Sequence, residues 1–183
     1  MYELLWFFIL YSLAGWALGT AAAAVREKKF VDIGFLFGPY CPSYGISALL
    51  FAVFLSELKN NLFFLFLGGT VLSFFVTIGT GFVLERIFHR KWWDYSRKRF
   101  QFGGYVTLPY TVLWGLIAVL CVSFANPLLT DLMHLIPRSI GELILIIAGI
   151  ILGIDLIGTI SGILTVRSRV NKASIVYRIS EDL

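Results

Sequence analysis

The chain has 183 residues, of which 58% are hydrophobic and 14% are charged, and its formal net charge is +4 at neutral pH. Soluble domains carry about 25% charged residues and about 45–50% apolar ones, so this chain has too little polar surface for a water-soluble globule. Its aromatic content of 16% also excludes intrinsic disorder, which requires low hydrophobicity. We therefore expect an all-α integral membrane protein, whose positive charge reports topology rather than nucleic-acid binding.

Five apolar segments are long enough, or nearly long enough, to cross a bilayer as helices. A spanning helix needs about 20 apolar residues. The expected spans, in chain order, are 4–25, 34–58, 62–84, 108–124 and 140–166. They predict one transmembrane domain over residues 1–166 and a short cytoplasmic tail over 167–183. The first basic residue, Arg26, follows the first span, so we expect that span to be retained rather than cleaved as a signal peptide.

The second span is the least regular of the five. An uninterrupted helical pattern covers only Tyr44 to Leu58. At 1.5 Å per residue this gives about 22 Å of helix, short of the ~30 Å hydrocarbon thickness. Glycine and proline interrupt the preceding apolar residues 34–42. We expect this stretch to enter the membrane as irregular or broken helix, which is tolerated only inside protein or beside water.

The basic residues are concentrated on one side of the expected helices. Of the 15 Lys and Arg residues, only Lys59 and Arg138 fall in the two loops on the other side. Because cytoplasmic loops carry the excess of Lys and Arg, we expect the N-terminus outside and the C-terminus in the cytoplasm. An odd number of spans agrees with this orientation, and the plasma (cytoplasmic) membrane is the expected location.

Glycines four residues apart occur in the first and fifth spans. The pairs are Gly15/Gly19, Gly149/Gly153 and Gly158/Gly162. Small residues let membrane helices approach each other closely. We expect these glycines to pack the bundle internally, with a dimer face as the alternative.

A six-residue pattern, Phe-x-Phe-Gly-x-Tyr, occurs at residues 35–40 and again at 100–105. Each copy follows a basic loop and precedes a span that begins with proline and tyrosine. The pattern suggests a parallel repeat of two helices and two helices, with a fifth helix added. Repeat-built transporters place their sites at interrupted segments, so the two helix starts predict a cavity. The candidate cavity-lining residues are Tyr40, Tyr44, Glu85, Tyr105, Tyr110 and Asp155.

Asp155 lies near the middle of the fifth span. A charged Asp at the bilayer centre costs about 2.5–3.5 kcal/mol on insertion scales, so it is expected to face the bundle interior or water. Two interpretations stay open, a proton- or cation-coupling carboxylate and a hydrogen-bonded structural residue. The candidate hydroxyl partners are Thr77, Thr80, Tyr44 and Tyr110.

The end of the third span and its loop carry a further set of polar and aromatic residues. Glu85 is expected to be an interfacial residue paired locally, and the alternative is an ion pair across the cavity mouth with Arg26 or Arg97. The loop is expected to form a membrane-anchoring belt, with a lipid or partner interface as the sharper alternative. Its candidate residues are Trp92, Trp93, Asp94, Tyr95 and Arg97.

Four stretches of the chain resemble the motifs of one bacterial membrane-protein family. They are Tyr11–Trp16 (YSLAGW), Phe35–Gly45 (FLFGPYCPSYG), Leu84–Ser96 (LERIFHRKWWDYS) and Leu108–Gly115. Together they resemble the family labelled "putative ABC-transporter type IV", also called CmpB-like, over about residues 7 to 120. The resemblance implies a small multi-span protein of the bacterial inner membrane that is transporter-like by label, with no established substrate.

Three positions depart from that family's pattern. The family carries a glutamate and an arginine where this chain has Gly19 and Ile33, and another arginine where it has Tyr105. An acid and a base are therefore both absent from the first repeat. These departures are consistent with a divergent paralogue or with one half of a heteromer, and a family activity that depends on those charges is not expected to carry over unchanged.

The sequence contains no GxxxxGK[ST], HExxH, CxxC or GxSxG motif. We therefore expect no cofactor, no metal site and no nucleic-acid partner, and enzymatic activity is the less favoured interpretation. The first hypothesis is a permease-like transport subunit for a small molecule or lipid, working as a homo- or hetero-oligomer with a separate ATPase. The second is a protein that binds or modifies membrane lipid, and the third is a scaffold. The lipid hypothesis would use Tyr40, Trp92, Trp93, Asp94 and Arg97.

Overall fold

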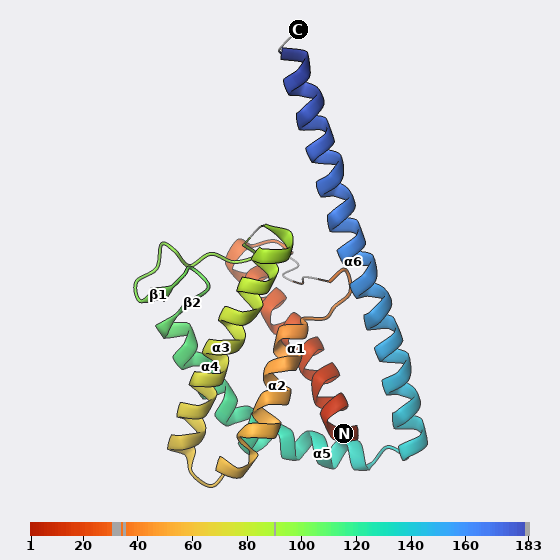
Figure 1. The fold of residues 1–183 in the computed structure, drawn as a ribbon. Coiled ribbons are helices and arrows are strands. Elements are labelled where there is room, and N and C mark those ends of the chain that lie inside the picture. The colour runs from red at the N-terminus through yellow and green to blue at the C-terminus, as the bar shows by residue number, and fades with distance from the viewer. Residues whose placement is uncertain (31–33, 35, 90, 182–183) are drawn as a thin grey trace.

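The computed structural model describes residues 1–30, 34, 36–89 and 91–181, with side chains up to Val166. This part of the chain is helical apart from its loops and one β-hairpin (Figure 1). The helices are α1 (Tyr2–Glu27), α2 (Pro42–Phe54), α3 (Leu62–Phe88), α4 (Leu108–Leu120), α5 (Asn126–His134) and α6 (Arg138–Glu181). The hairpin pairs β1 (Gln101–Phe102) with β2 (Val106–Thr107).

Four stretches of the described chain are long and apolar enough to cross a membrane. They are α1, α3, the combined segment 108–134, and α6 as far as Val166. Helix α2 has only 13 residues, which is about 20 Å of helix and less than a bilayer needs. The expectation of a helical membrane protein is therefore confirmed, whereas helix length does not establish five spans.

The fourth expected span, 108–124, continues further than expected and changes direction. Helix α4 runs into a π-helical turn at Cys121–Ala125, and α5 follows directly. Figure 1 shows α5 crossing the end of the bundle instead of continuing along α4. Pro127 accounts for the change, because it has no N–H and its ring would clash with the carbonyl of Ser123, four residues earlier. One wider turn relieves this conflict.

The helices α1 and α2 form one antiparallel pair, and α3 and α4 form another (Figure 1). Glycine allows close approach in both pairs. A Cβ atom on Gly45 would lie 2.3 Å from the Ser12 hydroxyl, and one on Gly69 would lie 2.3 Å from the Ala118 Cβ. The two pairs meet in a buried apolar cluster that draws on α2, α3, α4 and their connections. Its members are Phe51, Leu55, Leu65, Ala118 and Val122.

Helix α6 lies beside the bundle and reaches beyond it (Figure 1). Near its start, α6 packs against the bundle through Leu145, which forms a buried apolar cluster with Trp6, Phe7 and Met133. The backbone stays helical to Glu181, past the expected end of the span at residue 166.

Most apolar side chains on the outer side of α6 are exposed, as expected for a surface that faces lipid. The expectation that the glycines of α6 pack the bundle internally is wrong for three of the four. A Cβ on Gly149, Gly153 or Gly158 would meet no described atom within 4 Å, whereas one on Gly162 would touch Phe37 at 3.6 Å.

We call the end of the bundle that carries the C-terminal ends of α1 and α3 the basic end. Helix α1 ends with Lys28 in the left-handed conformation, and α3 ends in the same way at His89. The β-hairpin lies at this end beside α3 (Figure 1). It turns through Gly103 and Gly104, whose φ angles of 60° and 77° suit glycine.

Candidate functional site

The loop before α2 reaches deep into the bundle. The backbone N–H of Cys41 donates to the carbonyl of Ser12 at 3.0 Å, and the ring of Tyr44 fills the space that a Cβ on Gly15 would need. These contacts put the start of α2 level with the middle of α1, about 20 Å below its C-terminal end at Glu27. Residues 36–41 are not helical, and Pro42 occupies the first turn of α2, where its missing N–H costs nothing. The structure thus contains the broken helix that the sequence predicts.

The carboxylate of Asp155 on α6 holds this loop. It accepts the backbone N–H of Gly38 at 2.8 Å and that of Phe37 at 3.1 Å. Thr159, one turn further along α6, donates its hydroxyl to Asp155 at 3.4 Å and lies 3.3 Å from the Phe37 nitrogen. The hydroxyl neighbour of Asp155 is therefore Thr159, and the expected partners on α2, α3 and α4 are not among its described hydrogen bonds. Backbone N–H donors offset the cost of burying a carboxylate, and Asp155 forms no ion pair within the described part of the chain.

Aromatic rings join the start of α2 to the middle of α4, and the start of α4 to the loop that precedes it. Tyr44 and Trp114 are in edge-to-face contact with ring centroids 5.1 Å apart. Tyr110, at the start of α4, lies against Tyr95 of the preceding loop at 5.2 Å. Burial is the main reason that the pKa of the Tyr95 hydroxyl is raised, and the nearby Tyr110 adds to the effect. Two of the expected cavity residues, Tyr44 and Tyr110, thus belong to contacts that join the two helix starts to their surroundings.

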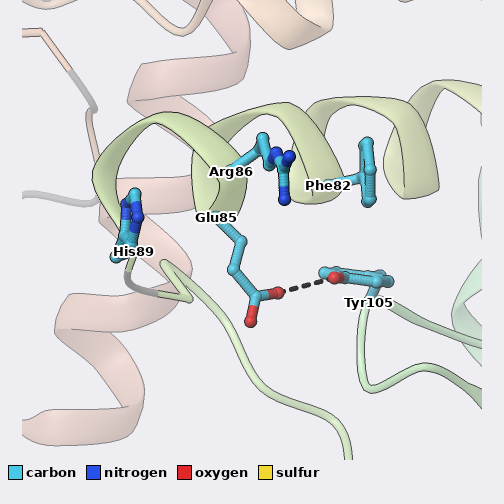
Figure 2. A pocket seen from close by; sticks show the side chains of 5 residues that line it. All are labelled: Phe82, Glu85, Arg86, His89 and Tyr105. Atoms are coloured by element: carbon cyan, nitrogen blue, oxygen red, sulfur yellow. Dashed lines mark hydrogen bonds between the residues drawn. The ribbon is translucent and has the colours of Figure 1, made fainter.

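Glu85 is paired with a tyrosine instead of a cation. The hydroxyl of Tyr105 donates to the Glu85 carboxylate at 2.6 Å (Figure 2). Gly81, one turn before Glu85, makes this possible, because a Cβ there would lie 2.8 Å from the Tyr105 ring. The hydrogen bond to Glu85 is the main cause that raises the pKa of Tyr105. The partner of Glu85 is thus a tyrosine 20 positions further along the chain, and no ion pair of Glu85 with Arg26 or Arg97 occurs among the described contacts.

An open pocket of about 360 Å³ surrounds this hydrogen bond. Phe82, Glu85 and Arg86 come from the last two turns of α3, His89 is the left-handed residue that ends this helix, and Tyr105 comes from the hairpin loop (Figure 2). Positions three and four apart on a helix share one side, so the pattern of α3 gathers an acid, two bases and an aromatic ring. The pocket therefore offers both signs of charge at the basic end of an apolar helix.

The loop of residues 91–99 folds on itself instead of presenting its aromatic residues outward. The indole N–H of Trp93 donates to the carbonyl of Tyr105 at 2.8 Å, and the backbone N–H of Tyr95 donates to Gly104 at 2.8 Å. Asp94 accepts hydrogen bonds from the hydroxyl and the backbone N–H of Ser96, which lower the pKa of its carboxyl. These contacts make Trp93 and Asp94 parts of the loop's own framework.

The residues proposed for an interface differ in exposure. Trp92 is half-buried against Phe88, with ring centroids 5.5 Å apart, and Trp93 and Tyr95 are also half-buried, whereas Asp94 and Arg97 are exposed. The charged side chains of the expected belt are therefore accessible to a headgroup or a partner, and its aromatic rings are partly covered.

The opening motif of residues 11–16 has a packing role. Tyr11 donates its hydroxyl to Asn126 at 2.7 Å and so joins α1 to the start of α5. Ser12 is fully buried, and its carbonyl accepts the Cys41 N–H described above. The side chains of Cys41 and Cys121 are both thiols rather than halves of a disulfide within the described chain.

The expected cavity residues fall into three places instead of one. Asp155 lies beside the loop that carries Tyr40. Tyr44 lies at the start of α2, and Tyr110 lies at the start of α4. Glu85 lies with Tyr105 at the end of α3. Four other residues hold these groups in place, although the sequence did not indicate them as site residues. They are Ser12, Gly81, Trp114 and Thr159. The departures at Gly19 and Tyr105 lie in the described chain, whereas Ile33, Phe35 and Arg90 lie outside the described residues.

Comparison with protein families gives a match to the family described as "putative ABC-transporter type IV", whose model covers residues 6–160. Searches of curated proteins and of solved structures give no match. The family match extends beyond the motifs to α5 and to the part of α6 that contains Asp155.

Proposed function

Because this chain belongs to the family described as "putative ABC-transporter type IV", we propose that it is the permease-like membrane subunit of a transport system for a small molecule or a lipid. The family and the four long apolar helices support a membrane protein related to transport. The permease role rests on one observation, the helix α2 that begins level with the middle of α1.

A helix that begins inside the bilayer is a device that transporters use. Discontinuous helices near the midplane form the substrate sites of many secondary transporters, and irregular backbone at this depth must be buried in protein or lie beside water. In our proposal the loop 34–41, α2 and the short 3₁₀ helix Ser56–Leu58 together form the second of five passes. Residues 1–166 are then one transmembrane domain with the N-terminus outside, and 167–183 are the cytoplasmic tail.

The pairs α1–α2 and α3–α4 act in this proposal as two halves of a parallel repeat. Both second helices begin with a proline in the first turn, and the contact between Tyr44 and Trp114 joins the start of α2 to the middle of α4. Movement of one pair against the other would open a path beside this contact. Asp155 positions the loop on the α2 side of that path, and α6 thereby controls its geometry.

The energy source in this proposal is a separate ATPase chain, because the sequence has no nucleotide-binding motif. The exposed basic residues of the loop after α3 are its proposed contact. They include Arg97, Lys98 and Arg99.

The two native cysteines provide a direct test of water access to the start of α2. Cys41 precedes α2, and Cys121 lies in the π-helical turn, and both are half-buried. The variant Cys121→Ser leaves Cys41 as the one thiol, and Cys41→Ala leaves Cys121. Each is reconstituted in vesicles of known orientation and treated with a charged, membrane-impermeant methanethiosulfonate.

Our proposal expects Cys41 to be modified from the basic end, faster than Cys121, and expects little modification from the opposite end. Modification of Cys121 in the matched variant reports general leakiness of the bundle. If Cys41 reacts only after denaturation, as a thiol sealed in apolar protein would, the start of α2 is not on an access path and the permease role loses its support.

A further inference from the structure

The pocket at the end of α3 combines groups of opposite charge in a manner that suits a zwitterion. Its walls are Phe82, Glu85, Arg86, His89 and Tyr105. Two of these side chains, Glu85 and Tyr105, are joined by a hydrogen bond of 2.6 Å (Figure 2).

The acidic side of the pocket fits a primary ammonium group. Tyr105 donates to one oxygen of the Glu85 carboxylate, which leaves the other oxygen able to accept further N–H donors. The ring of Tyr105 lies beside this carboxylate, and Phe82 adds a second ring to the pocket wall (Figure 2). Aromatic faces attract cations, and charge-assisted hydrogen bonds to a carboxylate are stronger than neutral ones.

The basic side of the pocket fits a phosphate. Arg86 is exposed and forms no hydrogen bond or ion pair with another described residue, so its guanidinium is able to bind two phosphate oxygens at once. His89, the residue that ends α3, lines the pocket as well. Lys91 is already engaged, since it donates to Gly103 at 2.9 Å and lies 4.8 Å from the Tyr105 ring centre.

The surroundings of the pocket fit a lipid. The same end of α3 exposes apolar side chains next to the pocket, with Phe82 55%, Val83 51% and Ile87 49% accessible. A long apolar helix places its terminal turn at the depth of the headgroups, where polar and charged side chains meet lipid phosphates. Acyl chains would then continue along the exposed face of α3.

We propose that this pocket binds a phospholipid whose headgroup carries both a phosphate and a primary ammonium, as in phosphatidylethanolamine. Arg86 and His89 hold the phosphate, and Glu85, with the rings of Phe82 and Tyr105, holds the ammonium. Phosphatidylglycerol lacks the ammonium, and the trimethylated ammonium of phosphatidylcholine has no N–H to donate to Glu85. The pocket therefore selects phosphatidylethanolamine over both.

The test measures lipid binding to the purified full chain in detergent by native mass spectrometry. Phosphatidylethanolamine, phosphatidylglycerol and phosphatidylcholine are compared for the wild type and for Glu85→Gln and Arg86→Gln. Glu57→Gln and Lys59→Gln, which change exposed residues outside the pocket, are the matched controls. Soluble phosphoethanolamine is added as a competitor, and thermal unfolding of every variant verifies the fold.

We expect phosphatidylethanolamine to bind best and each pocket variant to weaken it about tenfold, which corresponds to the loss of one charge-assisted contact. Glu85→Gln is expected to abolish the preference over phosphatidylglycerol, and the control variants to keep it. Competition by phosphoethanolamine alone would assign the site to the free headgroup compound and overturn the lipid. Equal binding of the three lipids, or a preference that survives Glu85→Gln in a folded protein, would overturn the proposal.

Discussion

The carboxylate of Asp155 accepts the backbone N–H of Gly38 at 2.8 Å, although 117 residues separate the two in the chain. This hydrogen bond joins the last helix of the bundle to the loop that starts α2. A Cβ on Gly38 would lie 2.9 Å from the same carboxylate oxygen, so glycine allows the approach. Asp155 thus has a defined structural role, whether or not it also carries a proton.

We predict that Asp155→Ala destabilises the protein by about 2–3 kcal/mol, because it removes hydrogen bonds to a charged acceptor and leaves the Gly38 N–H unpaired. Asp155→Asn keeps one acceptor oxygen and is expected to cost about half as much. Unfolding by denaturant in detergent micelles measures both. Asp131→Asn, at an exposed position on α5, should be neutral. If Asp155→Ala unfolds like the wild type, the loop does not depend on this carboxylate.

Two glycines of α3 are predicted to respond in opposite ways to alanine. Gly81→Ala places its Cβ 2.8 Å from the Tyr105 ring and 3.3 Å from Trp93, so the Tyr105 ring must shift, and we expect the bond to Glu85 to weaken. We expect a loss of about 1–3 kcal/mol from this overpacking. Gly79→Ala meets no described atom within 4 Å and should gain up to about 1 kcal/mol of helix propensity. Thermal unfolding of both variants in the same detergent compares their stabilities. An equal change in melting temperature for the two would refute the position that we assign to Tyr105.

Tyr105 is predicted to make the stability of the protein sensitive to alkaline pH. Its pKa in the folded state is raised above the ordinary value of 10.0, chiefly by the hydrogen bond to Glu85. A raised folded-state pKa contributes stability that is fully present below pH 10 and is lost as the pH rises through the folded-state value. Tyr105→Phe removes this contribution, so its stability should fall less steeply than that of the wild type above pH 10.

The control for this titration is Glu85→Gln, which keeps the tyrosine but removes the carboxylate. Its tyrosinate absorbance should develop at lower pH than in the wild type, because the cause of the raised pKa is gone. The pKa of Tyr95 is also raised, by burial, and this contribution is the same in all three proteins. Identical absorbance titrations for the wild type and Glu85→Gln would contradict the assigned cause.

Sequence patterns predicted the parts of this fold that depend on composition and periodicity. Apolar length located the four long helices, and the glycines and prolines of residues 34–42 predicted the interrupted start of α2. The hydroxyl neighbour of Asp155 is Thr159, four positions further along the same helix, where side chains share one face. The principal partners, however, are backbone N–H groups of the loop, which every residue but proline carries and which no pattern distinguishes.

The pairing of Glu85 with Tyr105 was also beyond the sequence. The two residues are 20 positions apart, and they meet because the β-hairpin at Gly103 and Gly104 returns the chain to α3. The absence of a side chain at Gly81 then decides how closely the ring approaches. Each of these features is local and weak in the sequence, and only their combination in three dimensions makes a pocket.

The glycines of α6 provide a last prediction, on assembly. A Cβ on Gly149 or Gly153 would meet no described atom of this chain within 4 Å, and the apolar residues around them are exposed. Gly149→Ala and Gly153→Ala should therefore stabilise an isolated chain by up to about 1 kcal/mol each. Gly45→Ala, which would place a Cβ 2.6 Å from the backbone oxygen of Phe8, is expected to destabilise it.

Chemical cross-linking in vesicles, together with unfolding in detergent, separates the two possible roles of this α6 surface. If the glycines face lipid, both alanine variants keep the cross-linking pattern of the wild type. If they instead let α6 pack closely on a second copy, the added methyl groups hold the helices apart and the cross-linked dimer is lost. No described residue of this chain contacts the space beside those glycines. We therefore expect the alanine variants to lower, if anything, the yield of cross-linked dimer and not the free energy of unfolding of the single chain.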